Sequence, residues 1–107
     1  TRLMRIAFRP EAERELLQAQ AWYEARAVGL GFEFARAIDG AISRIARTPR
    51  AFPFIAMPFQ HVIARRFPYS VIYHFNGTDV LIVAIHHHRR QAGDWSRRGP
   101  TSEESTP

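Results

Sequence analysis

Histidine and arginine are the side chains of this sequence best suited to chemistry, and they gather in its second half. The run His86–Arg90 holds three histidines followed by two arginines, and His61, Arg65 and Arg66 precede it. Histidine transfers protons near neutral pH because its ordinary pKa is about 6.5, and the planar fork of arginine binds two phosphate oxygens. These groups can therefore donate and accept protons and neutralise the charge of a phosphate.

Charge is unevenly distributed along the chain. All 15 basic residues are arginine, and six of them lie in residues 1–40, where six acidic residues balance them. Residues 41–98 hold nine arginines against only Asp79 and Asp94, and all five histidines also lie in the second half. This distribution indicates a polyanionic partner, either a nucleic acid or an acidic protein segment, with plain solubility as the alternative.

The residue types that are missing exclude several kinds of site. The chain has no cysteine, which excludes disulfides, thiolate zinc sites and a cysteine nucleophile. Neighbouring residues of a strand point to opposite faces, so only His86 and His88 of the histidine run can converge, and we expect neither a metal nor a cofactor. The longest apolar run, Val80–Ile85, is far shorter than the about 20 residues of a membrane-spanning helix. With no apolar signal segment visible after Thr1, we expect a cytoplasmic protein.

A strand and two helices are expected in the first half of the chain. Residues 3–8 alternate imperfectly and are followed by Pro10, which indicates a short strand. From Pro10 to Arg26 apolar residues recur with the period of a helix, and acidic residues occupy the first turn, where the positive dipole end favours them. A second helix is expected from Phe32 to Arg47, after Gly29 and Gly31. The short connection predicts an antiparallel helical hairpin.

Three strands are expected in the second half, over Gln60–Phe67, Ser70–Phe75 and Val80–His86. Asn76-Gly77 predicts a type I′ hairpin with positive φ at both residues, and residues 50–58 form an irregular, proline-containing connector. The order β-α-α-β-β-β predicts an α+β fold in which the antiparallel helical hairpin packs on one face of a small, mostly antiparallel four-stranded sheet. We expect one domain over residues 1–98 and a disordered polar tail over residues 99–107.

Strand alternation leaves open what covers the other face of the sheet. Val71 points to one face of the middle strand and Ile72 to the other, so both faces carry apolar side chains, yet two helices cover only one face. Either the connector with Phe52, Phe54 and Phe59 covers the second face, or a partner does, because monomers seldom expose a large apolar patch.

The expected sheet also predicts which candidate residues are neighbours. The carboxyl ends of the first and third meander strands meet at one end of the sheet, so Arg65 or Arg66 is expected beside the His86–Arg90 run. Because side chains alternate, His61 and Arg65 are expected on one face and Arg66 on the other. Arginines near the end of the second helix, such as Arg44, are explained by the negative end of the helix dipole.

Six short segments between residues 4 and 98 carry a family resemblance. They are Phe8–Glu13, Ala21–Glu24, Gly29–Phe32, Ile38–Ile42, Arg66–Tyr73 and His88–Arg90 with Trp95. Taken together and in this order, they resemble the RelE/ParE superfamily of toxins. The resemblance implies the toxin half of a bacterial type II toxin–antitoxin (plasmid stabilisation) module, which a small cognate antitoxin neutralises in a hetero-oligomeric complex.

Two activities divide that superfamily. ParE-like toxins bind DNA gyrase and block replication without being enzymes, whereas RelE-like toxins enter the ribosome and cleave mRNA. The RelE-like nucleases carry an arginine where this chain has Ser70, together with lysines, which this chain lacks. The Trp22-Tyr23 pair and the Phe67–Tyr69 turn are closer to ParE-like members. The resemblance therefore implies a ParE-like gyrase inhibitor, with a RelE-like ribosome-dependent mRNA endoribonuclease as the alternative.

The candidate residues serve the two activities differently. A ribonuclease would use His86, His88, Arg89 and Arg66 as catalytic groups. For either activity, the residues expected to bind the target or a nucleic acid are Arg65, Arg66, His61, Arg89, Arg90 and Trp95. The sequence assigns no individual residue to the antitoxin, which we expect on apolar surface that the hairpin leaves uncovered, beside the basic half of the chain.

Overall fold

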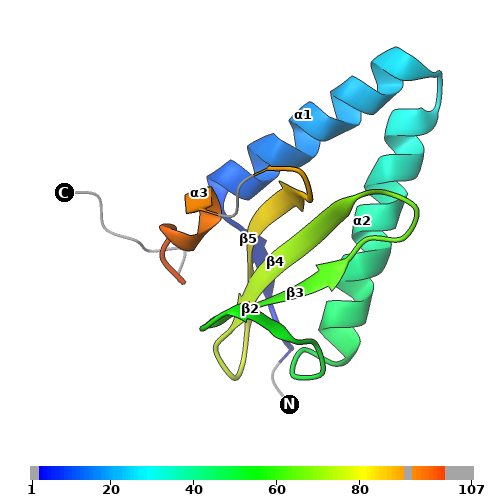
Figure 1. The fold of residues 1–107 in the computed structure, drawn as a ribbon. Helices are drawn as coiled ribbons and strands as arrows, with labels where there is room; N and C mark the ends of the chain where they lie inside the picture. Colours follow the sequence, from blue (N-terminus) through cyan, green and yellow to red (C-terminus); the bar gives the residue numbers. More distant parts are fainter. Residues whose placement is uncertain (1–2, 91–92, 101–107) are drawn as a thin grey trace.

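The protein is described by a computed structural model over residues 3–90 and 93–100. Its elements in chain order are β1 (Ile6–Phe8), α1 (Pro10–Arg26), α2 (Leu30–Arg47), β2 (Phe54–Ala56), β3 (Phe59–Ile63), β4 (Tyr69–Phe75), β5 (Val80–His87) and α3 (Gly93–Ser96). The sheet order is β1-β5-β4-β3-β2, with β1 parallel to β5 and the other neighbours antiparallel (Figure 1). The expected α+β class is confirmed. Residues 101–107 of the expected tail lie outside the described residues.

The sheet has one strand more than expected, because β2 forms inside the connector and pairs with β3. Polar side chains hold the connector against the sheet. The amide nitrogen of Gln60 donates hydrogen bonds to the carbonyls of Pro49 (3.1 Å) and Phe52 (2.8 Å), and the Tyr73 hydroxyl donates to Pro49 (2.7 Å). The segment that the sequence indicated as irregular therefore runs along the edge of the sheet, where its backbone adds a short strand.

The helical hairpin follows from local sequence. Pro10 begins α1 and Glu11 and Glu13 lie in its first turn, which agrees with the free N–H groups and positive dipole at that end. Gly29 has a φ of +88°, a left-handed conformation that glycine adopts without the steric cost of a Cβ atom. Gly31 is required for a different reason: a Cβ atom there would lie 2.6 Å from the Gln20 carbonyl oxygen of α1. The two helices can therefore approach closely at their connected ends.

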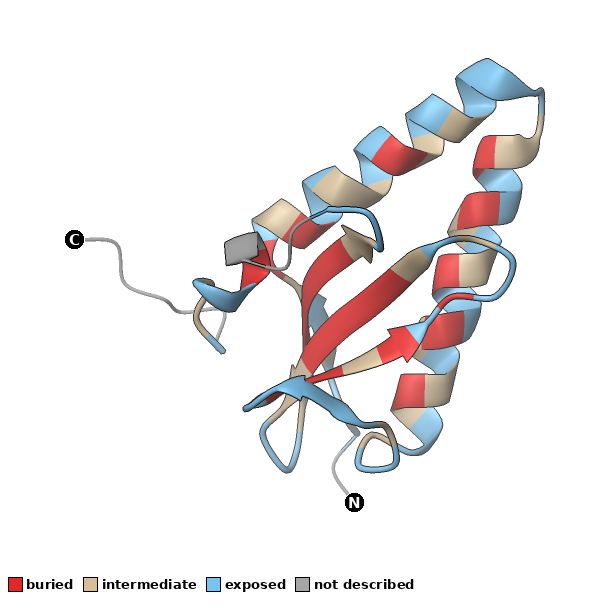
Figure 2. Ribbon diagram, in the orientation of Figure 1, coloured by how far each residue is buried: buried red, intermediate tan, exposed pale blue. Residues whose placement is uncertain are grey.

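The hairpin packs on one face of the sheet. Figure 2 shows buried positions recurring along α2 and along β4 and β5. The apolar residues buried between helices and sheet include Ala12 and Ala19 of α1, Phe34, Ile38, Ala41 and Ile45 of α2, and Val62, Val71, Tyr73, Val80, Ile82 and Ile85 of the strands. These positions recur every three or four residues on α2 and stabilise the fold by removing apolar surface from water.

The second face of the sheet is covered by the chain itself. Trp95 of α3 is 2% exposed and lies edge to face with Phe59, with ring centroids 5.6 Å apart. Together with Ile72, Leu81, Val83 and Ala84 these two rings form a separate buried cluster. Neither expectation for this face was right as stated. Of the three connector rings only Phe59 reaches it, since Phe52 packs on the helix side and Phe54 is exposed. The segment after β5 supplies the remaining cover, because a single indole can shield a small apolar patch.

Two turns differ from expectation. Only Gly77 of the Asn76-Gly77 pair has positive φ (+101°), so the type I′ turn is wrong. The Asn76 side-chain oxygen instead accepts hydrogen bonds from the backbone N–H groups of Thr78 (2.9 Å) and Asp79 (2.8 Å), which makes a four-residue connection. The strand expected to reach Phe67 ends at Ile63, and Arg66 in the following turn has a φ of +73°.

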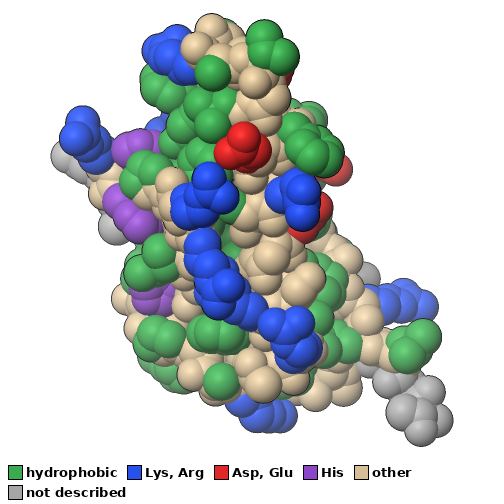
Figure 3. All heavy atoms as spheres, turned by 90° about the vertical axis from the view of Figure 1, so that its right-hand side faces the viewer, with side chains coloured by type: hydrophobic (Ala, Val, Ile, Leu, Met, Phe, Trp, Pro, Cys, Tyr) green, Lys and Arg blue, Asp and Glu red, His purple; other side chains and the backbone are tan. Residues whose placement is uncertain are grey.

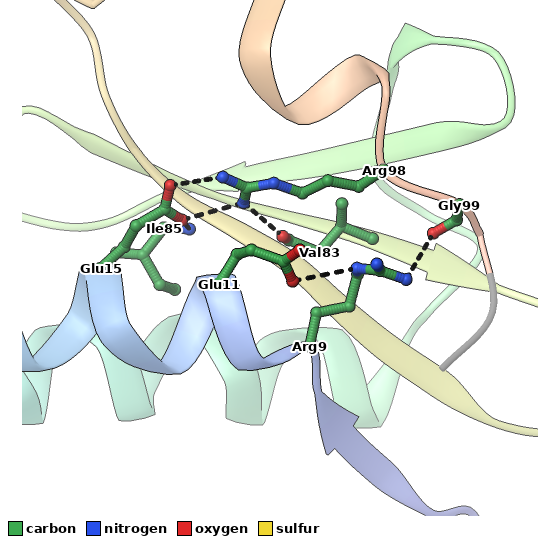
Figure 4. A network of polar contacts seen from close by, with 7 residues as sticks. All are labelled: Arg9, Glu11, Glu15, Val83, Ile85, Arg98 and Gly99. Carbon is green, nitrogen blue, oxygen red and sulfur yellow. Dashed lines mark hydrogen bonds and ion pairs between the residues drawn. The ribbon is translucent and has the colours of Figure 1, made fainter. Parts of the chain in front are cut away.

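A polar network closes the edge of β5 where β1 has ended (Figure 4). Glu15 of α1 accepts a hydrogen bond from the backbone N–H of Ile85 (3.0 Å), and Arg98 donates to the carbonyl of Val83 (2.8 Å). Arg98 also binds both carboxylate oxygens of Glu15, at 3.1 and 2.9 Å. This pair satisfies backbone groups that a longer β1 would have paired, and it ties the segment after α3 to the hairpin.

Candidate functional site

The turn after β3 and the end of β5, which carry most of the candidate residues, lie at one end of the sheet, as expected. The turn between β3 and β4 contacts the end of β5, where the backbone N–H of His88 donates to the Pro68 carbonyl (2.9 Å). Within this end, however, the side chains divide into three groups that face different elements. We describe these groups as the histidine patch, the α1 groove and the arginine row.

The histidine patch consists of His61, His86 and His88 with Ser70, on the face of the sheet that α3 covers. Ser70 pairs with His86 across the strands, and its hydroxyl lies 3.0 Å from Nε2 of His88. The rings of His86 and Trp95 lie 6.4 Å apart. Burial, and then the charge of His88, lowers the pKa of His61. Burial also lowers the pKa of His86, with Glu15 opposing the shift and the neighbouring cations adding to it. His61 and His86 therefore favour the neutral imidazole form.

The α1 groove is a hollow of about 420 Å³ between α1 and the ends of β4 and β5. Its lining includes Glu15, Trp22, Tyr23, Tyr69, His87, Arg89 and Arg90. The ring of His87 lies edge to face with Tyr69, with centroids 4.9 Å apart, and its Nδ1 accepts a hydrogen bond from the backbone N–H of Arg89 (2.9 Å). Burial, and then the charges of Arg89 and Arg90, lowers the pKa of His87. The sequence offered His87 as a member of the His86–Arg90 run but gave it no role of its own, although strand alternation places it opposite its two neighbours.

The arginine row lies along α2 and the turn after β3 and consists of Arg36, Arg44, Arg47 and Arg65. These four residues line a hollow of about 340 Å³ together with Ala37, Gly40 and Ser43. Arg66 lies beside the row and pairs with Glu33 of α2, with Nη2 and Oε1 3.6 Å apart. Burial, and then the charges of Arg65 and Arg47, lowers the pKa of Arg44. The spacing of residues 36, 40, 43, 44 and 47 is that of one helix face and could have revealed the row.

The structure therefore brings His61, His86 and His88 together, and Arg89 and Arg90 together, but directs Arg65 and Arg66 to α2. The expected division of His61 and Arg65 onto one face with Arg66 on the other does not hold, because the strand ends at Ile63 and alternation stops there. Trp95, expected at a binding surface, lies in the buried cluster under α3, so its ring serves packing.

Two further observations concern residues 3–90 and 93–100. In that part of the chain no group of three or more histidine or acidic side chains is arranged to hold a metal ion. None of the helices described there has the length and apolar character needed to cross a bilayer.

Comparison with known proteins identifies the family. Residues 6–92 match the family described as the ParE toxin of type II toxin-antitoxin system, parDE. A solved structure entitled "Chromosomal ParDE TA system from P. aeruginosa" superposes with a TM-score of 0.67 at 14% sequence identity, covering 79% of this chain and 96% of that chain, which shows a shared fold. No curated protein matches the chain. The family match spans most of the sequence and confirms the resemblance carried by the six segments, so this chain belongs to the ParE toxin family and is the toxin component of a type II toxin–antitoxin system.

Proposed function

We propose that this toxin acts by binding DNA gyrase and stalling it, without itself catalysing a reaction, and that its cognate antitoxin blocks this binding. The observation that carries the proposal is the divergence of the groups a nuclease would need. Arg66 pairs with Glu33 on the α2 side, Arg89 lines the α1 groove, and His86 lies against Trp95.

RNA cleavage requires a more exact arrangement of side chains than binding to a target protein does. A base, an acid and a cation must reach the two oxygens and the phosphate of a single scissile bond. Side chains that face different helices and strands do not converge on one scissile bond. A binding surface, in contrast, can use side chains spread over several elements. Both proposed targets lie in the bacterial cytoplasm, where we therefore expect the toxin to act.

The second candidate is a ribosome-dependent mRNA endoribonuclease, and one observation favours it. His61 and His86 have lowered pKa values and are therefore neutral imidazoles suited to accepting a proton, and the Ser70 hydroxyl lies 3.0 Å from Nε2 of His88 beside them. In this reading His86, His88, Arg89 and Arg66 would be the catalytic groups.

Two assays separate the candidates. Purified toxin is added to a gyrase supercoiling reaction and, separately, to a translation extract in which cut messages are mapped. We expect loss of supercoiling with trapped cleaved DNA, and uncut messages. Cut messages with normal supercoiling would overturn the gyrase proposal in favour of the nuclease.

Variants in the two groups sharpen the comparison. We expect Arg89→Ala to weaken gyrase binding and His88→Ala to leave inhibition largely intact, because only Arg89 lines the exposed α1 groove. Arg14→Ala on the exposed side of α1 is the matched control for loss of one charge. A nuclease would instead lose its cleavage rate in the His88 variant.

We further propose that the antitoxin covers the apolar residues that the fold leaves exposed. Val28 lies in the connection between α1 and α2, and Phe32 lies in the first turn of α2, at the end of the hairpin that extends beyond the sheet (Figure 1). Trp22 lines the α1 groove, and all three side chains are more than half exposed. Met57 and Ile63 near the β2 edge are also exposed. Surfaces of this kind mark protein interfaces. We expect Phe32→Ser to weaken antitoxin binding measured by calorimetry, with Leu3→Ser, at an exposed site outside both patches, as control.

A further inference from the structure

Among the described residues, the arginine row is a strongly charged surface that includes no residue of the proposed gyrase groove or of the apolar antitoxin patches. It lies on the α2 side of the molecule, turned away from the α1 groove, and Figure 3 shows arginines gathered in a band across that side. The histidines visible in this view lie beside the band rather than in it. The row therefore needs an explanation of its own.

The row has the shape of an extended, accessible track. Eleven residues of α2 separate Arg36 from Arg47, which corresponds to about 16 Å along the helix axis. Between them the surface is hollowed, because Gly40 has no atom within 4 Å of the position a Cβ would take. Arg44 is anchored by a hydrogen bond from Nη2 to the carbonyl of Ile63 (3.2 Å), which joins the helix to the end of β3. Arg65 then extends the charge from the helix onto the turn.

The charge of the row is not neutralised by its surroundings. No acidic residue lines the hollow. Two acidic residues lie three positions from Arg36 in the chain: Glu33 is engaged by Arg66, and Asp39 does not line the hollow. The negative end of the α2 dipole accounts for cations in the last turn, Arg44 and Arg47, but it does not explain Arg36, two turns earlier, or Arg65, on another element. Four cations around one hollow create a positive potential that attracts a polyanion.

We propose that the arginine row binds the phosphate backbone of duplex DNA without reading its sequence. Protein-binding surfaces carry apolar or aromatic anchors at their centre, whereas this hollow is lined only by arginines and the small residues Ala37, Gly40 and Ser43. Single-stranded nucleic acids bind by stacking their bases on aromatic side chains, and no aromatic residue lines the hollow. A polar, strongly cationic surface is the kind that meets a duplex backbone. The track of about 16 Å corresponds to roughly five base pairs along the axis of a duplex, at 3.4 Å each, which is long enough for its arginines to contact several phosphates.

The binding test uses the full chain separated from its antitoxin, so that only the toxin contacts DNA. A fluorescent duplex of arbitrary sequence is titrated at about 50 mM and about 200 mM salt with the wild type and with R36S/R47S/R65S. The matched control, R5S/R14S/R97S, removes the same charge from exposed positions elsewhere. We expect the row variant to lose at least about tenfold in affinity and its salt slope to fall by about two to three, and the control to lose less than about threefold.

Additional arms separate duplex DNA from other polyanions. R36K/R47K/R65K retains the positive charges and is expected to keep most of the affinity, which also excludes misfolding as the cause of a loss. A single strand of the same length and a glutamate-rich peptide are expected to bind more weakly than the duplex. Equal losses in the row and control variants, or tighter binding of the single strand or the peptide through these arginines, would overturn the proposal. Because gyrase is absent, either result leaves the proposed function to its own test.

Discussion

Beyond the end of β1, one edge of β5 has no neighbouring strand. The side chains of Arg98 and Glu15 bind the backbone of β5 there instead. Each is largely buried, and together they satisfy the carbonyl of Val83 and the N–H of Ile85. A buried polar group without a hydrogen-bond partner destabilises the folded state, and a hydrogen bond removes this penalty. These contacts join two segments far apart in the chain, so they carry stability that no local pattern in the sequence revealed.

Removing Arg98 should therefore destabilise the fold. We expect Arg98→Ala to lower the free energy of unfolding by about 2–4 kcal/mol, because it leaves Glu15 and the Val83 carbonyl without their partner. The neighbouring Arg97→Ala, at an exposed position, should change it by less than about 0.5 kcal/mol. Urea unfolding measures both. Equal effects in the two variants would show that the network contributes little.

The histidine patch makes stability depend on pH. The pKa values of His61 and His86 are lowered by burial, so below pH 7 the unfolded chain binds more protons than the folded chain. The free energy of unfolding should therefore decrease as the pH falls from about 7 towards about 5, starting near the ordinary histidine pKa of about 6.5. Urea midpoints at several pH values in this range measure the slope.

Histidine substitutions identify which residues cause this decrease of the free energy of unfolding with falling pH. His86→Gln removes one of the responsible groups and should flatten the decrease, whereas His74→Gln, on the same sheet but outside the patch, serves as the control. Stability that rises as the pH falls through this range would contradict the assignment.

At the level of elements, agreement with the sequence was best where the pattern is local. The first helix begins and ends at the expected residues, Pro10 and Arg26, because its periodicity and first-turn acids lie within its own sequence. The second begins two residues earlier than expected, at Leu30, because Gly29 provides the left-handed turn. By contrast, β2 and α3 were missed, since each is stabilised by contacts with distant parts of the chain rather than by its own pattern.

Two glycines of α2 should respond oppositely to the same substitution. Gly31→Ala is expected to destabilise the protein by about 1–3 kcal/mol, because the new Cβ would lie 2.6 Å from the Gln20 backbone oxygen. Gly40→Ala meets no atom within 4 Å and should stabilise by about 0.5–1 kcal/mol through reduced backbone entropy of the unfolded chain. Thermal unfolding of the two variants tests this. A neutral Gly31→Ala would mean that the helices can separate without cost.

At the scale of the whole molecule, the two faces of the sheet are both covered by this chain, so the large apolar face expected to await a partner is absent from the described residues. The exposed apolar residues lie instead at the hairpin end and near the β2 edge. We therefore expect antitoxin binding to combine these smaller patches with the basic surface, so that charge contributes a larger share of the binding free energy.

The contribution of charge to antitoxin binding can be measured by its dependence on salt. The excess of arginine in residues 41–98 predicts that complex formation with the antitoxin weakens with salt. Between about 50 and about 300 mM salt, we expect the dissociation constant of the toxin–antitoxin complex to rise by about fivefold or more. The main change should be slower association, because salt screens the electrostatic attraction between the two proteins. Stopped-flow or surface binding kinetics at fixed pH measure this. A dissociation constant that does not change with salt would assign the interface to the apolar patches alone.

The sequence by itself determined the helical hairpin, the antiparallel strands, the family and the concentration of cations in the second half, because periodicity, capping residues and short motifs act over a few neighbouring residues. Only the tertiary structure decided where those cations point. Arg65 and Arg66 turn towards α2 because β3 ends before them, and Trp95 is buried because α3 packs on the second face. Side-chain direction at the end of a strand depends on packing between distant segments, and one-dimensional spacing does not contain that information.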